Sequence, residues 1–464
     1  MNRQFFTRLI APLALCGLFG CFPITEEGVY DGVVGPELFS EPTTHDGDDW
    51  LFSPDRINRI DLTLDEDAVE ILRSERRFSY PRNKVRADAV FDGEAIGDIG
   101  VRLRGGLGSF NRFDGKPKFE LDFNRFSGEA VFGLKSISLN NMINDCSRIR
   151  EPLAYAAYGL LGLPTSRTGY AQLFINGEDY GLFLTLETQD DQWLERTFDD
   201  GSGNLYDGKY VFSGFWPLIV DFGIDRDHWF DLEEGEDIAF EDVARVSRGV
   251  KQSFETGTMD STLAELVDWS ELTTLLRIEE WTISGDGYQG GPNNYRVYFE
   301  PGKPMVITPW DRDDTFQTNE ADGDSEVAVH KNPDLFSQQG SNLGQICFAD
   351  EDCLALWEAT KPVVEARLLD GSLQDLGESI FSLLEPSYAE KAVRDENCSP
   401  EIGRLEAAAI LDYIQTGEAE TWSEGENPYS ACSVSSAAEK RILPVFLLFS
   451  MLALWRRQRR ESPD

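Results

Sequence analysis

The sequence predicts an α+β fold in which strands dominate the first part of the chain and helices the second. Between residues 57 and 187, runs of alternating apolar and polar residues recur, as in half-buried strands. Asp92-Gly93 and Asn176-Gly177 are turn dipeptides typical of tight hairpins. After residue 260, apolar residues recur at helical spacing. Since the two kinds of segment are segregated along the chain, we expect an α+β fold.

The length and the charge of the chain restrict what it can be. Its 464 residues suffice for two or three domain-sized units with a substantial core. The 83 acidic and 42 basic residues give a formal net charge of −41. We therefore expect no nucleic-acid partner, because a phosphate backbone requires a basic face. This charge fits a secreted or surface protein that is kept soluble by repulsion.

The first 21 residues predict an export signal, with two arginines, an apolar run and small residues before Cys21. The segment 18–21, LFGC, resembles a lipoprotein signal and would make Cys21 the lipidated first residue of the mature protein. Phe19 is unusual in that motif, so ordinary cleavage is the alternative. Residues 22–56 are rich in Gly, Pro, Thr and Asp and predict a tether.

Ordered structure is expected from residue 57 onward. Two helices, 65–76 and 147–161, interrupt the strands of the first part, and the second carries Glu151 near its start. The predicted strands are 59–64, 84–91, 101–104, 119–123, 136–141, 170–175 and 180–187.

The second part of the chain is expected to be mainly helical. We expect loops over residues 199–241, one long helix over 261–283, and two strands at 295–299 and 305–309. Further helices are predicted over 354–369, 373–385 and 403–415. Cys347 and Cys353 could form a local disulfide in an oxidising compartment, whereas any pairing of Cys146 and Cys398 cannot be read from the sequence.

The C-terminal tail, residues 432–464, has the pattern of a sorting segment. Cys432 precedes an apolar run at 442–455, and four arginines follow it. The run is short for a transmembrane helix, which needs ~20 residues, and the arginines would stay in the cytoplasm. The arrangement resembles the MYXO-CTERM type of tail, which implies display at the surface of a Gram-negative cell. A short amphipathic or aggregation-prone tail is the alternative.

Polar residues gather between residues 283 and 315. Asp286 follows a predicted helix, Asn293 and Asn294 precede one strand, and Asp311 and Asp313 follow the next. A hairpin could bring these oxygen ligands together, and Mg²⁺ or Ca²⁺ prefers such ligands. In phosphoryl transfer, one carboxylate accepts the hydroxyl proton while an Asn and a second Asp hold the metal. The alternative is a plain hairpin with a solvated run of Asp.

The first part of the chain offers further candidates for phosphate binding. The glycine loop 105–109 could cradle phosphate with its backbone N–H groups, or be a plain hairpin loop. Lys116 could reach phosphates or lie at the surface. Glu187 ends a strand and is either solvated or the partner of a buried lysine, as in kinases. The acidic loop 319–326 could hold Ca²⁺ but lacks the full ligand pattern.

Seven segments in this order resemble the spore-coat CotH kinase family. The resemblance implies a divergent protein-kinase-like fold over about 57–400, with a mostly β N-terminal lobe (about 57–200) and a helical C-terminal lobe (about 201–400), before a helix and linker at 401–431. The segments are VRLRGG (101–106), GKPKFELDFNRF (115–126), SRIREPLAY (147–155), INGEDYGLFLTLE (175–187), GNLYDG (203–208), GDGYQGGPNNYRVYF (285–299) and PWDRDDTF (309–316).

The resemblance also implies roles for individual residues. Asp286 would be the catalytic base. The nucleotide would be bound by Lys116, its partner Glu187 and Arg104. A metal, Mg²⁺ or Mn²⁺, would be held by Asn294, Asp311 and Asp313. Two departures from the family pattern are Lys118, where a small residue is usual, and Gln317 in place of a glycine.

The resulting expectation is an exported atypical protein kinase that transfers phosphoryl from ATP to side chains of surface or secreted proteins. It would be anchored at the cell surface or outer membrane through its N-terminal lipid, its C-terminal tail or both. Two alternatives stay open, because a fold does not fix a chemistry. One is a surface binding or adhesion module without turnover, and the other is a kinase-like enzyme that transfers AMP or a glutamyl group.

Overall fold

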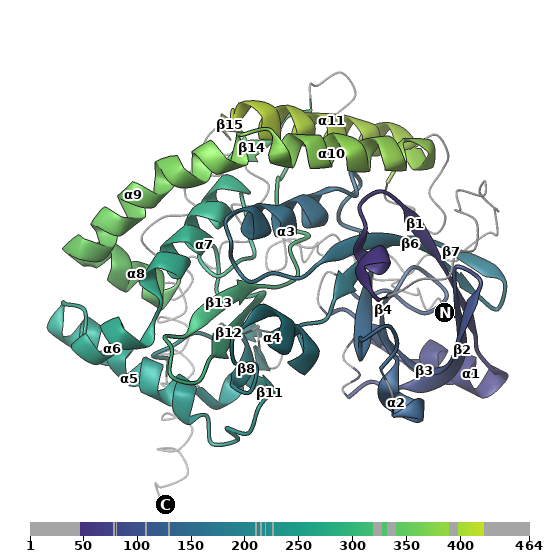
Figure 1. The fold of residues 1–464 in the computed structure, drawn as a ribbon, viewed down its shortest axis with the longest axis horizontal. Coiled ribbons are helices and arrows are strands. Elements are labelled where there is room, and N and C mark those ends of the chain that lie inside the picture. Colours follow the sequence, from purple (N-terminus) through teal and green to yellow (C-terminus); the bar gives the residue numbers. More distant parts are fainter. Residues whose placement is uncertain are drawn as a thin grey trace, which may run out of the picture. The chain divides into compact units, whose positions relative to one another are not determined.

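Seven strands form a closed barrel in the first part of the computed structural model (Figure 1). Their order is β1-β2-β3-β4-β5-β7-β6, and parallel pairing of β1 with β6 closes the barrel. The strands are β1 (Ile57–Thr63), β2 (Val85–Phe91), β3 (Glu94–Arg104), β4 (Lys118–Asp122), β5 (Ser136–Asn140), β6 (Thr168–Ile175) and β7 (Glu178–Glu187). The structure describes residues 47–421 except 78, 80, 107–108, 129, 209–210, 214–215, 219, 225–226, 319–326, 332–339 and 389–397.

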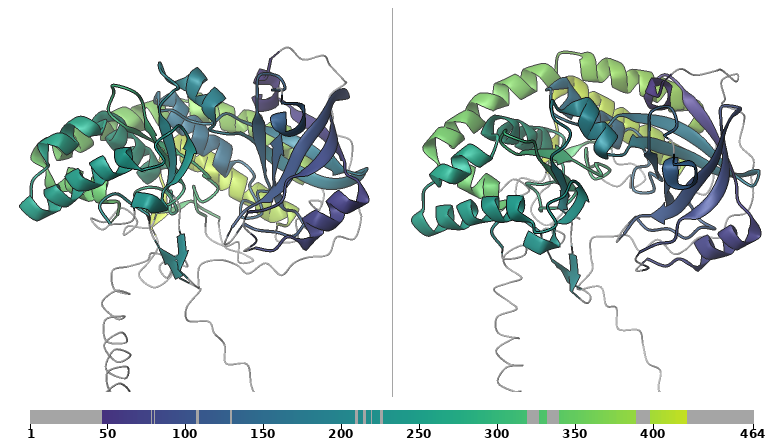
Figure 2. Two further views of the ribbon diagram at one scale, coloured as in Figure 1. Left: turned by 90° about the horizontal axis from the view of Figure 1, so that it is seen from below. Right: turned by 60° about the horizontal axis from the view of Figure 1, so that its bottom comes forward.

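The barrel confirms the strands and hairpins expected from the sequence. Asn176 and Gly177 join β6 to β7 with φ angles of 53° and 80°, the left-handed conformation that this turn requires. Alternating side chains fill the interior, where Phe119, Leu121 and Phe183 are fully buried. In Figure 2 the barrel strands, drawn in purple to blue, curve around a common axis.

The fold begins earlier than the predicted end of the tether at residue 56. Asp49–Phe52 form a 3₁₀ helix in which Trp50, Leu51 and Phe52 are buried. A Cβ on Gly169 of β6 would lie 2.2 Å from the carbonyl oxygen of Leu51, so this segment packs directly on the strand. Three consecutive apolar residues supply the burial that holds it there. The predicted signal segment, the rest of the tether and the sorting tail lie outside the described residues.

A second, antiparallel sheet has the order β11-β8-β12-β13. The prediction of loops over 199–241 was therefore wrong in part. This stretch contains β8 (Asn204–Gly208), β9 (Val211–Ser213), β10 (Trp216–Leu218) and β11 (Asp231–Glu234). β8 pairs with β12 (Tyr295–Phe299), which lies far away in sequence, so no local pattern marks it as a strand. β13 (Val306–Pro309) pairs with β12 as expected.

Helices pack around α3, the helix that leaves the barrel. α10 and α11 lie side by side, and α10 contacts α3 (Figure 1). The expected single helix over 261–283 is two helices, because Val267 forms a β-bridge with Met305 and Asp268 caps the second helix. The helices of more than one turn are α1 (Glu66–Ser74), α3 (Arg150–Leu160), α4 (Asp191–Thr197), α5 (Glu241–Thr256), α6 (Ser261–Leu266), α7 (Trp269–Trp281), α8 (Asn342–Ala349), α9 (Glu351–Leu368), α10 (Ser372–Leu384) and α11 (Pro400–Thr416).

Among the described residues, two disulfide bonds link helical segments. Cys347–Cys353 joins α8 to α9, as the sequence suggested, and Cys146–Cys398 joins the entry of α3 to the entry of α11. Among the described helices, none is both long and apolar enough to cross a membrane. The strand-rich first part and the helix-rich second part agree with the α+β class, and their division into two lobes stays a prediction.

Candidate active site

The β12–β13 hairpin brings Asn294 and Asp311 to the same end of the second sheet. Tyr295 is opposite Pro309 in the register, and the Trp310 N–H donates to the Asn294 carbonyl at 3.1 Å. Asn294 and Asp311 have φ angles of 49° and 48°. Non-glycine residues seldom adopt such angles, and they persist only where the surrounding structure holds them. The hairpin is therefore held in a constrained conformation at two of the three predicted metal ligands.

Asp286 lies in the loop after α7 and is oriented by two amides. Asn293 Nδ2 and Asn294 Nδ2 donate to its two carboxylate oxygens, each at 2.9 Å. Burial and the nearby carboxylate of Asp314 raise the pKa of Asp286 to about 8, against the effect of the Asn293 hydrogen bond and of Arg312. The predicted base is thus a carboxylate with an unusually high proton affinity, fixed at both oxygens.

A lysine lies between the two predicted metal-binding aspartates. Lys118 Nζ is 3.0 Å from Asp311 Oδ1 and 3.4 Å from Asp313 Oδ2, and its side chain is 8% exposed. Burial disfavours the ammonium, but the two carboxylates outweigh it and raise the pKa of Lys118. Burial raises the pKa of Asp313 to about 6. For Asp311, the charge of Lys118 outweighs burial and lowers the pKa.

Glu151, in the first turn of α3, is a fourth member of this cluster. It is 1% exposed and accepts a hydrogen bond from Asn140 Nδ2. Its Oε1 is buried without a hydrogen-bond partner among the described residues. Burial, together with the charges of Asp311 and Asp313, raises its pKa well above the ordinary value, and Lys118 opposes this. A buried acid in this position faces the same cation as Asp311.

The predicted pair of Lys116 and Glu187 does not form. Within the described part of the chain, Glu187 pairs with Arg167 at 2.8 Å and with Arg196 at 2.6 Å. Lys116 is buried near the ring of Phe183, with Nζ 5.6 Å from the ring centroid. Lys118, with Glu151 near it, instead lies beside the predicted metal ligands Asp311 and Asp313.

The reason for this difference is the start of β4. The strand begins at Lys118, whose backbone pairs with that of Arg104, while Lys116 precedes the strand and turns toward the barrel core. Both lysines and Glu151 are visible in the sequence, but the structure brings Lys118, and not the predicted Lys116, to Asp311 and Asp313. The position of Glu151 in the first turn of a helix was the one sequence signal that could have marked it as a site residue.

Arg104, predicted to bind the nucleotide, lies beside the cluster at the end of β3. Its Nη1 donates to Ser138 Oγ at 3.2 Å and lies 3.5 Å from Glu120 Oε2. Its guanidinium is 5.7 Å from the ring centroid of Trp310, the residue before Asp311. Burial raises the pKa of Asp311, the charge and hydrogen bond of Lys118 lower it, and the charge of Arg104 adds a smaller lowering effect. Arg104 is thus a half-buried cation at the edge of the carboxylates.

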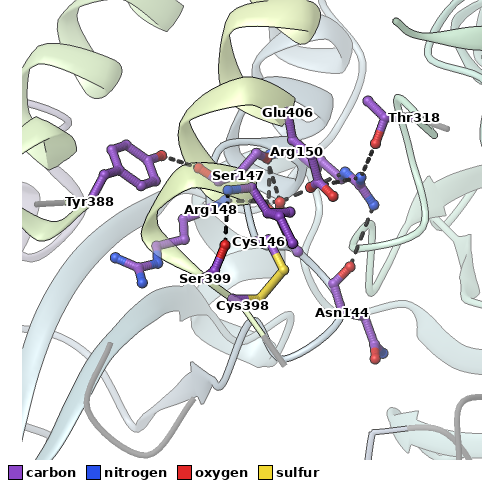
Figure 3. The surroundings of a disulfide bond; sticks show 12 residues. Asn144, Cys146, Ser147, Arg148, Arg150, Thr318, Tyr388, Cys398, Ser399 and Glu406 are labelled. Atoms are coloured by element: carbon purple, nitrogen blue, oxygen red, sulfur yellow. Dashed lines mark hydrogen bonds and ion pairs between the residues drawn. A yellow bond between two sulfur atoms is a disulfide. The ribbon is translucent and has the colours of Figure 1, made fainter. Parts of the chain in front are cut away.

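The entry of α3, which presents Glu151, is anchored from several sides (Figure 3). The Cys146–Cys398 disulfide lies just before the helix. Arg150 Nη2 donates to Thr318 Oγ1 at 3.0 Å and to Glu406 Oε2 of α11 at 3.1 Å, and Figure 3 shows these bonds next to the disulfide. Tyr388 Oη donates to the Ser147 carbonyl. These contacts fix the backbone from which Glu151 projects.

The residues present fit a divalent cation only if Lys118 moves. Among the described residues, no three Asp, Glu, His or Cys side chains are already arranged as a metal site. The carboxylates of Asp311 and Asp313 instead contact Lys118 Nζ. Their oxygens, the Asn294 amide oxygen and the unpartnered Oε1 of Glu151 are nevertheless hard ligands of the kind that Mg²⁺ and Mn²⁺ take. The Ca²⁺ loop considered at 319–326 lies outside the described residues.

An open cavity of about 460 Å³ lies away from this cluster. Its lining is acidic, so it does not suit the phosphates of a nucleotide. The acidic lining residues are Asp191, Glu195, Asp199, Asp200 and Glu234. We therefore place the candidate active site at the buried charged cluster and not at this cavity.

The chain was also compared with models of known protein families. The model described as CotH kinase protein matches residues 101–352, which is more than half of the chain. This range includes the candidate site residues described above, from Arg104 on β3 to Asp313 after β13, and also the residues that line the acidic cavity. A comparison with curated proteins gave no match.

Proposed function

Because the chain belongs to the CotH kinase protein family and is kinase-like, we propose that it transfers the γ-phosphoryl group of ATP to side-chain hydroxyls of surface or secreted proteins. One observation carries the proposal: a buried lysine, Lys118, contacts Asp311 and Asp313 next to the buried acid Glu151. Phosphoryl transfer needs fixed positive charge on the phosphates, carboxylates for a metal and a base for the acceptor hydroxyl. The cluster would supply the positive charge and the carboxylates, and Asp286 would supply the base.

Each residue has a role that follows from its surroundings. Lys118 would bind the nucleotide phosphates, and Glu151 would hold its ammonium once the metal takes the carboxylates of Asp311 and Asp313. Arg104 would neutralise phosphate charge at the edge of the cluster. Asn294, Asp311 and Asp313 would hold Mg²⁺ or Mn²⁺, which neutralises charge on the phosphates when bound.

Asp286 would accept the proton of the acceptor hydroxyl. A general base works best when its pKa is near the working pH, and burial raises the pKa of Asp286 to about 8. Asn293 and Asn294 bind both of its oxygens, so they fix the direction in which it accepts a proton. An exposed aspartate would be a much weaker base.

The cellular setting is part of the proposal. The predicted export signal and sorting tail, together with a formal charge of −41, support a protein displayed at the cell surface. The protein substrates would then be secreted or surface proteins of the same cell.

Two measurements on the full chain test this function. In the first, thermal unfolding is followed with ATP, with Mn²⁺ or Mg²⁺, and with both. A ligand at ~100 times its Kd adds about 2.7 kcal/mol to the free energy of unfolding. We expect a shift that needs nucleotide and metal together and is lost in Asp311→Asn. If neither wild type nor variant shifts, the nucleotide site is wrong and a binding module is the better description.

The second measurement follows transfer of label from ATP to protein. We expect label from the γ-phosphate, and none in Asp286→Asn, although that variant should still show the thermal shift. Label from the α-phosphate would instead identify AMP transfer. Incorporation of glutamate that depends on ATP would identify glutamyl transfer.

A further inference from the structure

Arg312 lies between Asp311 and Asp313, but its contacts are with a different set of groups. It is 1% exposed, and its Nε donates to the Trp310 carbonyl at 3.0 Å. Its Nη2 donates to the carbonyls of Asn294, at 2.5 Å, and Asp286, at 3.3 Å. One guanidinium thus binds the main chain at the predicted base and at a predicted metal ligand.

The remaining nitrogen of the guanidinium, Nη1, contacts a buried acid on α7. Arg312 Nη1 is 3.2 Å from Glu279 Oε1 and 3.2 Å from Ser284 Oγ. Glu279 is 1% exposed, and its two oxygens accept the backbone N–H groups of Tyr288 and Gln289, each at 2.8 Å. Glu279 therefore binds the backbone of residues 288–289, just after Asp286. Arg312 binds the carbonyl of Asp286 before these residues and the carbonyl of Asn294 after them.

We propose that Arg312 and Glu279 are a positioning pair that fixes the segment 284–294, with its base Asp286, against the β12–β13 hairpin. The inference rests on the proposed function, since it assigns these residues to the same site. Neither side chain needs to touch a substrate. Apart from their own ion pair and the bond to the Ser284 hydroxyl, their bonds go to carbonyl and N–H groups of the main chain. They therefore set where Asp286 and Asn294 lie and not how those residues react.

The backbone at the hairpin explains why such a pair is needed. Asn294 and Asp311 both have positive φ angles, which the surrounding structure must maintain. Arg312 binds the carbonyl of Asn294 and is joined by a peptide bond to Asp311. A planar guanidinium can serve several carbonyl acceptors at fixed angles, which the point charge of a lysine cannot do.

The test compares Glu279→Gln and Arg312→Lys with a matched control on the same helix. Arg277 is also buried on α7, at 5% exposed, and it binds the Trp357 carbonyl and Glu280 away from the site. Arg277→Lys should lower the melting temperature without changing kcat, when all proteins are assayed well below their own melting temperatures.

The expected result separates kcat from KM. Glu279→Gln should lower kcat about 100-fold, because small misplacements of reacting groups cost this much. Its KM for ATP should stay within about threefold of wild type, because Glu279 binds the segment after Asp286 directly and reaches Asn294 only through Arg312. Arg312→Lys should lower kcat at least as much and also raise KM, because it also binds Asn294. Wild-type kcat in both folded variants, or an equal loss in Arg277→Lys, would overturn the inference.

A second readout does not depend on activity. Hydrogen exchange of the Tyr288 and Gln289 amides should speed up in Arg312→Lys, although their acceptor Glu279 is unchanged, while exchange in α7 stays as in wild type. If the wild-type protein transfers no group at all, the proposed function fails and exchange alone decides the positioning role. Unchanged exchange at these two amides would then show that Arg312 does not hold the segment.

Discussion

Lys118 Nζ, at the start of β4, lies 3.0 Å from Oδ1 of Asp311, which follows β13. This contact is the most informative one in the molecule, because a metal and the ammonium would compete for the same carboxylate oxygen. Under the proposed function we therefore expect metal and nucleotide to bind together, with the metal at Asp311 and the phosphates at Lys118.

The first prediction separates the two neighbouring lysines. Lys118→Met should abolish transfer and remove the joint thermal shift with ATP and metal, because phosphate charge loses its cation. Lys116→Met should keep both, with at most a change in stability, because Lys116 faces Phe183 of the barrel core. Parallel transfer assays and melting curves of the two variants check this. Loss of transfer in Lys116→Met alone would restore the original assignment from the sequence.

The sequence predicted the site better at its second half than at its first. Asp286, Asn294, Asp311 and Asp313 lie close together along the chain, and one hairpin suffices to gather them. Their arrangement could therefore be read from turns and strand ends.

The first half of the site depends on contacts between distant segments. Glu151 comes to Lys118 through the path of α3, and Lys118 is distinguished from Lys116 only by where β4 begins. Neither fact has a local pattern. The missed strand β8 has the same explanation, because its partner β12 lies far along the chain. The broken helix at Val267 likewise reflects a bridge to Met305, a contact that no helical periodicity can indicate.

The second prediction concerns the pH dependence of stability at Asp221. This buried carboxylate accepts the Asn342 N–H at 2.7 Å and the Tyr288 hydroxyl at 3.1 Å. Burial raises its pKa from 3.8 to about 6, so the folded protein holds this proton more tightly than the unfolded chain. The stabilisation that protonated Asp221 gives the folded protein is therefore complete below 3.8, the pKa of Asp221 in the unfolded chain. It is lost as the pH rises through about 6, its pKa in the folded protein.

Asp221→Asn cannot ionise, so its unfolding free energy should rise relative to that of wild type by about 2 kcal/mol between pH 4 and pH 6.5. Denaturant unfolding at several pH values measures this difference, and Asp55→Asn, at an exposed acid, serves as control. A gap between variant and wild type that stays constant with pH would contradict the prediction.

The third prediction concerns Glu187, which was expected to bind the nucleotide lysine. Its buried carboxylate binds Arg167 and Arg196, so Glu187→Gln should weaken two charge-assisted hydrogen bonds and lower stability by about 1–3 kcal/mol. Transfer per folded molecule should not change. Glu151→Gln gives the matching comparison, because it should slow transfer strongly with a smaller effect on stability. If Glu187→Gln slowed transfer strongly and Glu151→Gln did not, Glu187 and not Glu151 would belong to the active site.

The fourth prediction concerns the Cys146–Cys398 disulfide, which closes a loop with a sequence separation of 252 at the entry of α3. Replacing both cysteines by serine should lower stability by about 2–5 kcal/mol, because a long loop regains its freedom in the unfolded chain. The same change should loosen the turn that presents Glu151. Arg148 and Arg150 lie two and four residues after Cys146, and they bind Ser387 and Glu406. Transfer should therefore slow more than in the double serine variant of Cys347 and Cys353, whose disulfide joins α8 to α9 away from the cluster. Kinetics and chemical unfolding of both variants measure the two effects separately. Equal transfer rates in the two variants would show that the first disulfide stabilises the fold without positioning Glu151.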